Sequence, residues 1–200
     1  MTPNEVVAMV RAAQQRGQHT LDAARIAEMC AAYGVPTPEQ QVVHDAADAA
    51  FVGSSIGFPV AMKVISADAS HKTDVGGVIL GVRDAEAAAG AYDELVARMD
   101  ARRIALDGVL VQGMAGAGVE LVIGAATDPT FGKVVMFGVG GVLVETMRDV
   151  TFGLAPVDLP RAHAMLNEIQ ASALLDGVRG QPPVDRDAVA RLIVAVSRMA

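Results

Sequence analysis

The stretch Val60–Gly77, VAMKVISADASHKTDVGG, constrains what this chain can fold into more than any other stretch. It begins as a short apolar run that contains one lysine, Lys63, and continues as a polar loop that ends in the pair Gly76-Gly77. A short apolar run that follows a proline is typical of a strand, and a glycine pair lets backbone N–H groups approach an anion closely. An amine on a strand followed by a basic loop of this kind suits a polyphosphate ligand.

The segments around this stretch predict an α/β lobe. Glycine and proline divide them into short helical and extended patterns, which give a helix, strand, helix, strand, strand, helix order. That order favours mixed strand pairing over a simple doubly wound sheet. The predicted elements are a helix over 3–16, a helix over 21–33 with Thr20 as its N-cap, a strand over 40–43, a helix over 45–56, strands over 60–65 and 77–82, and a helix over 84–101.

The second half of the chain predicts consecutive strands. Val109–Met114, Val119–Ala126 and Lys133–Phe137 are separated by glycine-bearing or Asp-Pro turns, as in an antiparallel meander. Short strands over 142–144 and 154–156 and helices over 159–169 and 185–199 follow. We therefore expect an α/β (α+β) chain of two lobes, with a boundary near 107–108.

Composition excludes several classes of protein. Hydrophobic residues make up 52% of the chain and charged residues 20%, so a core can form. The 16 basic and 23 acidic residues give a formal charge of -7 and there is no tryptophan, so we expect no nucleic-acid partner. The longest apolar run, Val134–Val144, is shorter than the ~20 residues of a spanning helix. A single cysteine, Cys30, leaves no partner for a disulfide, so we expect a cytoplasmic protein with no membrane contact.

Lys63 is the first candidate site residue. Strand alternation places it on the face opposite Met62 and Val64. A lysine inside an apolar strand needs a compensating anion, which a phosphate supplies. The alternative is an edge-strand lysine that blocks strand addition or reaches water.

His71, in the loop, is open to three interpretations. The first is an ordinary polar loop residue. The second is a donor of a proton or a hydrogen bond to phosphate, and the third is a nucleophile that itself carries phosphate. The other histidines lack ligand-like spacing, so a histidine metal site is not expected.

Carboxylates in the second half are candidates for Mg²⁺. Glu120 and Glu145 interrupt apolar strands, and Asp149 follows Glu145 by four positions. The alternative for them is a solvent-facing position on a half-exposed sheet. Arg148 either contacts a phosphoryl group or pairs with Asp149. The run Gly138–Gly141 lacks the phosphate-loop and dinucleotide patterns, which favours a tight corner.

Several spaced blocks resemble the ATP-grasp part of ADP-forming acyl-CoA synthetases, relatives of the succinyl-CoA synthetase β subunit. The blocks are GFPVAMKVISADASHKTDVGGVILGV, VLVQGM, VELVIGAATDPTFGKVVMFGVGGVLVE and RDVTFGLAP, and the resemblance covers about residues 20 to 200. It implies an ATP-grasp fold whose two lobes hold ATP, and an enzyme that interconverts acid, CoA and ATP with acyl-CoA, ADP and phosphate through an acyl phosphate and a phosphohistidine. The implied partners are a CoA-binding subunit or domain that carries the phosphohistidine, a small-molecule acid and CoA. The implied cofactors are ATP/ADP and Mg²⁺.

The residues and the resemblance together define the candidate site. Lys63 would contact ATP phosphates, the Val111–Met114 segment would meet adenine, and His71 would take part in phosphoryl transfer. The full set is a catalytic His71; nucleotide-binding Lys63, Val111, Gln112, Gly113, Met114 and Glu120; a phosphate-end group of Lys72, Asp74, Gly76, Gly77 and Arg148; and Glu145 as a metal ligand.

The chain departs from the family pattern in two places. Relatives usually have a glutamate where this chain has Gly113, and the closing E-x-D-x-N-P strand with a later aspartate, which supplies metal ligands, has no counterpart. We expect a helical extension over 1–18, lobe 1 over 19–108, and a lobe 2 over 109–200 that stops before its metal-binding strand. We also expect a chain that is incomplete and turns over poorly alone. The alternatives are a regulatory ATP-grasp module, such as that of a protein acetyltransferase, and a ligase or lyase acting on a different acid.

Overall fold

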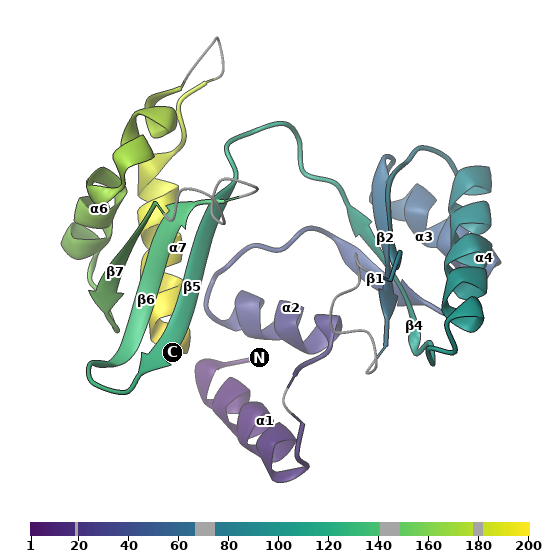
Figure 1. Cartoon of the computed structure of the whole chain (residues 1–200), viewed down its shortest axis with the longest axis horizontal. Coiled ribbons are helices and arrows are strands. Elements are labelled where there is room, and N and C mark those ends of the chain that lie inside the picture. Colours follow the sequence, from purple (N-terminus) through teal and green to yellow (C-terminus); the bar gives the residue numbers. More distant parts are fainter. Residues whose placement is uncertain (19, 67–74, 141–148, 178–181) are drawn as a thin grey trace. The chain divides into compact units, whose positions relative to one another are not determined.

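The computed structural model describes the chain except residues 19, 67–74, 141–148 and 178–181 (Figure 1). Its residues form two compact units. We call the unit made of Met9–Glu28 and Thr37–Gly116 the N-terminal unit. The C-terminal unit consists of Met1–Ala8, Met29–Pro36 and Ala117–Ala200.

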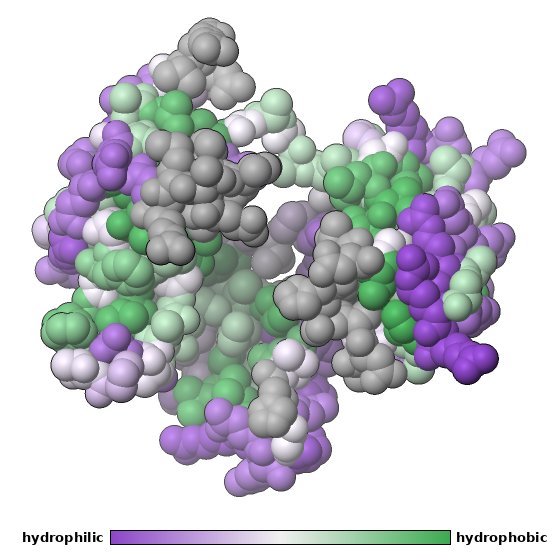
Figure 2. All heavy atoms as spheres, in the orientation of Figure 1, coloured by the Kyte–Doolittle hydropathy of each residue, from purple (hydrophilic) through white to green (hydrophobic). Residues whose placement is uncertain are grey.

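The N-terminal unit contains a four-stranded sheet with the order β1-β4-β2-β3, in which all neighbours are antiparallel. Its strands are β1 (Gln40–Val43), β2 (Val60–Ile65), β3 (Val78–Val82) and β4 (Gly108–Gly113). Helices α3 (Ala46–Ile56) and α4 (Ala85–Ala101) lie along one face, and the outer surface of α4 is hydrophilic (Figures 1 and 2). The core between helices and sheet includes Val60, Met62, Val64, Val109, Val111, Ala49, Val52 and Leu95.

Aspartates begin the helices of the N-terminal unit. Asp45 and Asp84 cap α3 and α4 by accepting hydrogen bonds from the N–H groups of Asp48 and Ala87, at 2.7 and 2.8 Å. Such caps satisfy backbone donors that a helix leaves unpaired. Helix α1 spans Pro3–Gln15 and α2 spans Ala23–Ala32. The cap predicted at Thr20 was wrong, because the Asp22 carboxylate accepts the N–H of Arg25 at 2.9 Å instead.

The C-terminal unit contains a three-stranded antiparallel sheet, β5-β6-β7. Its strands are β5 (Leu121–Asp128), β6 (Gly132–Val139) and β7 (Val150–Leu154), followed by α6 (Leu159–Glu168), the 3-10 helix η1 (Gln170–Asp176) and α7 (Arg186–Met199). Helices α6 and α7 cover one face of the sheet (Figure 1). The core between them includes Val135, Phe137, Val139, Met165, Leu166 and Ile193.

The structure corrects the expected organisation of the second half. The strand at 108–113 pairs with β1 and β2 rather than opening the meander, so only β5, β6 and β7 follow one another in the second sheet. The N-terminal unit extends through Gly116. The strand predicted over 154–156 was misplaced, because β7 ends at Leu154. The strand predicted over 142–144 lies outside the described residues, and the assignment of the two lobes and the N-terminal extension stays a prediction.

No helix in the part of the chain that the structure describes is long and apolar enough to cross a membrane.

Candidate functional site

Lys63 lies on an interior strand of the N-terminal sheet, between β4 and β3. Met62 and Val64 are fully buried against the helices, as strand alternation predicted. The half-buried Lys63 shares the opposite face with Gln112, since Gln112 pairs with Ala61 in the register. Its Nζ donates a hydrogen bond to Gln112 Oε1 at 2.6 Å. The interpretation of Lys63 as an edge-strand lysine was therefore wrong.

Gln112 extends this contact to a third strand. Its Nε2 donates to Oε1 of Gln40 at 2.7 Å, and the two residues are partners in the β1–β4 register. Sequence reasoning missed Gln40, which lies 72 positions from Gln112 along the chain. No local pattern marks it, because only the pairing of β1 with β4 brings the two amides together.

The Val111–Met114 segment covers the last residues of β4 and the residue after it, and backbone N–H groups in it are hydrogen-bonded within the protein. The Val111 side chain is fully buried in the core. The N–H groups of Gly113 and Met114 donate to the carbonyls of Glu39 and Pro59, at 2.9 and 3.4 Å. The adenine contact expected of this segment stays a prediction. The backbone N–H groups of Gly113 and Met114 already donate to carbonyls of the protein.

The pair Gly76-Gly77 is attached to both β2 and α4. The carbonyl of Gly77 accepts the N–H of Val64 at 2.9 Å, and the carbonyl of Gly76 accepts Nη1 of Arg98 at 2.8 Å. Gly76 has φ +67, a left-handed conformation in which glycine avoids steric strain. The structure thus places Lys63 and Gln112 on neighbouring strands, and the glycine pair directly precedes β3, the other neighbour of β2. Arg98 was not predicted, since nothing in the sequence of α4 sets it apart.

Five predicted site residues, His71, Lys72, Asp74, Glu145 and Arg148, lie outside the described residues. Their roles stay predictions.

The carboxylates that the structure does describe form no metal site. Glu120 is exposed and lies just before β5, whereas Asp149 is only 7% exposed. The two carboxylate oxygens of Asp149 accept the N–H groups of Gln170 and Ala171, both at 2.7 Å, so Asp149 caps η1. Over the described ranges no three His, Cys, Asp or Glu residues gather as a metal would require. Glu120 and Asp149 as the structure describes them do not fit a magnesium ion.

Gly138 and Gly140 allow close packing of the backbone. A Cβ added to Gly138 would lie 2.6 Å from the carbonyl oxygen of Asp149, and one added to Gly140 would lie 3.1 Å from the carbonyl carbon of Glu120. The N–H of Gly140 also donates to the Glu120 carbonyl at 2.7 Å. Gly138 lies within β6 and Gly140 directly follows it, so these contacts reflect close packing of backbone strands, and the corner expected to begin at Gly138 was wrong.

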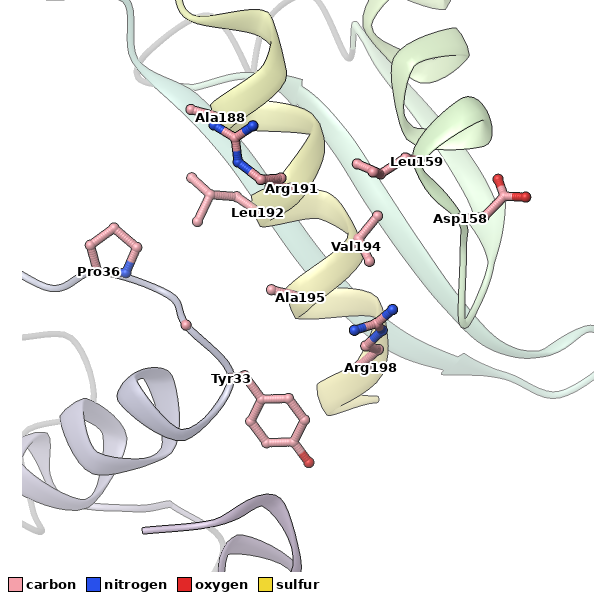
Figure 3. A pocket seen from close by; sticks show the side chains of 11 residues that line it. Tyr33, Pro36, Asp158, Leu159, Ala188, Arg191, Leu192, Val194, Ala195 and Arg198 are labelled. Carbon is pink, nitrogen blue, oxygen red and sulfur yellow. The ribbon is translucent and has the colours of Figure 1, made fainter.

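A hollow of about 680 Å³ lies in the C-terminal unit (Figure 3). Its lining comes from α7, the start of α6 and the segment after α2, and includes Tyr33, Leu159, Arg191, Leu192 and Arg198. None of the predicted site residues lines it.

A polar cluster joins β7 to α6. Arg161 and Thr151 both donate hydrogen bonds to the carboxylate of Glu168, and Arg161 Nη2 also donates to the carbonyl of Phe152 at 2.7 Å. The hydrogen bond from Arg161, followed by that from Thr151, lowers the pKa of Glu168 below its ordinary value of 4.5. The same contact with Glu168 raises the pKa of Arg161.

This cluster predicts an acid-dependent contribution to stability. A carboxyl group whose pKa is lower in the folded state stabilises it above the unfolded pKa, and the contribution disappears as the pH falls through the folded value. We expect the wild type to have a higher free energy of unfolding than Glu168→Gln. This difference should be largest above about pH 5 and should shrink below pH 4.5. Urea unfolding at pH 7, 5, 4 and 3 measures it, and a difference that is independent of pH would contradict the assignment.

The sequence of this chain matches a known domain family and several characterised relatives. An ATP-grasp domain model matches residues 12–200. The acetate–CoA ligase [ADP-forming] I of Archaeoglobus fulgidus is 41% identical over 170 residues, which cover 84% of this chain and 25% of the relative. The β subunit of acetate–CoA ligase [ADP-forming] I of Pyrococcus furiosus is 38% identical over 177 residues, which cover 86% of this chain and 75% of that subunit. The chain thus spans about a quarter of the first relative and three quarters of the second.

Solved structures agree with these matches. Acetyl-coenzyme A synthetase 1 of Ca. Korarchaeum cryptofilum, in complex with coenzyme A and Ca-AMPCP, matches with a TM-score of 0.90 at 36% identity, over 96% of this chain and 85% of that chain. The same protein with coenzyme A and Mg-AMPPCP, its phosphohistidine segment pointing towards the nucleotide binding site, matches with a TM-score of 0.83 at 36% identity, over 97% and 84%.

Proposed function

The chain belongs to the ATP-grasp domain family found in ADP-forming acyl-CoA synthetases, and we propose that it is the ATP-binding part of such an enzyme. The complete enzyme converts an acid, CoA and ATP into acyl-CoA, ADP and phosphate. The observation that carries this proposal is the half-buried Lys63, held by Gln112 on an interior strand beside the strand that follows Gly76-Gly77.

Lys63 supplies the charge that a polyphosphate requires. The chain has a formal charge of -7, so a nucleotide is not attracted by the net charge and depends on local cations. The hydrogen bond to Gln112 limits the motion of the ammonium group before a ligand arrives. A cation already held in place stabilises charge that develops on phosphoryl oxygens without further reorganisation.

The remaining chemistry requires a partner. We propose a CoA-binding subunit or domain that carries the phosphohistidine, with ATP entering as its magnesium complex and His71 acting in phosphoryl transfer. Support comes from the relative that is itself a β subunit and from the solved complex of another protein with Mg-AMPPCP. In this scheme ATP phosphorylates the histidine of the partner and leaves as ADP. The phosphohistidine then transfers its phosphoryl group to the acid to give an acyl phosphate, and CoA displaces inorganic phosphate from the acyl phosphate to give acyl-CoA. We also place the protein in the cytoplasm, in keeping with its single free cysteine.

The test uses the complete complex with γ-labelled ATP, Mg²⁺, CoA and a panel of short-chain acids. We expect acid-labile label on the CoA-binding partner, lost when CoA and the acid consume it, and formation of ADP and acyl-CoA in equal amounts. His71→Ala should reduce the rate of labelling. A complex that binds ATP but never transfers label would overturn the proposal and favour a regulatory module.

A further inference from the structure

A row of polar groups crosses three strands on the face of the N-terminal sheet that the helices leave open. Lys63 on β2 donates to Gln112 on β4 at 2.6 Å, and Gln112 donates to Gln40 on β1 at 2.7 Å. All three side chains are half-buried. The neighbouring positions Ala61 and Leu110 on this face are apolar and buried, so the row lies in surroundings that strengthen its hydrogen bonds.

The chemistry of the lysine sets the direction of every hydrogen bond in the row. An ammonium group has donors only, so the atom of Gln112 that faces Lys63 must be the carbonyl oxygen. The NH₂ group of Gln112 then faces Gln40, which must present its own carbonyl oxygen in turn. A single orientation of each amide satisfies the row, even though oxygen and nitrogen of an amide have nearly the same shape.

We propose that Gln40 is a positioning residue for the nucleotide, acting through Gln112 to hold the ammonium group of Lys63. Gln40 accepts the hydrogen bond that keeps the oxygen of Gln112 turned toward Lys63. Because a free lysine side chain carries about 2 kcal/mol of rotamer entropy, holding it before the ligand binds reduces the entropy lost on binding. The proposal rests on the proposed function, since it takes Lys63 to contact the phosphates of ATP.

The experiment is a double-mutant cycle on the complete complex. Gln40→Met keeps the length of the side chain and removes its carbonyl acceptor, and Gln112→Met does the same at the centre of the row. The dissociation constant of Mg-ATP is measured by calorimetry for the wild type, both single variants and the double variant. The exposed neighbour Gln41 provides the matched control, Gln41→Met.

We expect Gln40→Met to raise the dissociation constant of Mg-ATP roughly tenfold, which corresponds to about 1.4 kcal/mol. In the Gln112→Met background the same change should have less than a twofold effect, because its path to Lys63 is already broken. The KM for ATP should rise while the KM for CoA stays unchanged, a split that a general loss of folding would not produce. Gln41→Met should match the wild type.

Two results would overturn the inference. One is an unchanged affinity in Gln40→Met while Lys63→Met weakens binding. The other is an equal effect of Gln40→Met with and without Gln112, which would show that it does not act through that amide. If the wild-type complex itself fails to bind Mg-ATP, the proposed function is overturned, and this inference with it.

Discussion

Lys63→Met is expected to slow ATP-dependent phosphoryl transfer by about 100-fold or more in the complete complex, since removing one preorganised group that stabilises developing charge typically costs 2.7–4 kcal/mol. Methionine keeps the apolar stem of the side chain, which packs on the sheet, and removes only the ammonium group. The loss should therefore appear in catalysis rather than in folding. The oxygen of Gln112 also loses its donor, which adds a small cost in stability.

The measurement is the rate of labelling from γ-labelled ATP, with urea unfolding of each variant in parallel. Lys133→Met is the matched control, because Lys133 is an exposed lysine on β6 in the other unit. It should retain the wild-type rate. Labelling by Lys63→Met at the wild-type rate would remove Lys63 from the site, and with it the observation on which the proposed function depends.

Asp149→Ala is expected to lower the free energy of unfolding by about 3 kcal/mol, because it deletes two charge-assisted hydrogen bonds and leaves two N–H groups without an acceptor. Asp149 is 7% exposed, and its carboxylate oxygens accept the N–H groups of Gln170 and Ala171 at 2.7 Å. Water has little access to replace it, so the penalty is larger than for an ordinary exposed cap.

Asp158→Ala is the control for this prediction. Asp158 caps α6 from an exposed position by accepting the N–H of Arg161 at 2.9 Å, so its loss should cost about 1 kcal/mol. Urea unfolding compares the two variants, and titration with Mg²⁺ at fixed ATP tests for a metal role. Unchanged stability of Asp149→Ala together with weaker Mg²⁺ dependence would show that Asp149 is a metal ligand after all.

Most helices and strands could be predicted because their signals are local. The helices α3 and α4 begin after Asp45 and Asp84, and β2 occupies the predicted residues Val60–Ile65. Capping and alternation depend on residues within a few positions of one another, so a single sequence contains them. The cap at Asp22 was missed because Thr20 and Asp22 are both suitable caps that lie next to the start of the same helix.

The sheet to which a strand belongs could not be predicted in the same way. The strand β4 is apolar and is followed by a glycine-bearing segment, which suits a meander as well as a central strand. Its pairing with β1 and β2 depends on residues far away in the chain. Because the entropy cost of closing a loop changes little with loop length, the distance along the chain does not tell which strands pair. Asp149 was ambiguous for a similar reason, because its partners lie 21 and 22 positions away.

The sequence by itself determined that Lys63 lies on a strand, on the face opposite a buried core, and next to a loop suited to phosphate. These properties follow from side-chain alternation and from the composition of neighbouring residues. Only the tertiary structure decided that β2 is an interior strand and that Lys63, Gln112 and Gln40 form one hydrogen-bonded row. Hydrogen bonds between side chains require the register of strands that are distant in sequence, and that register is set by the packing of the whole sheet rather than by any local pattern.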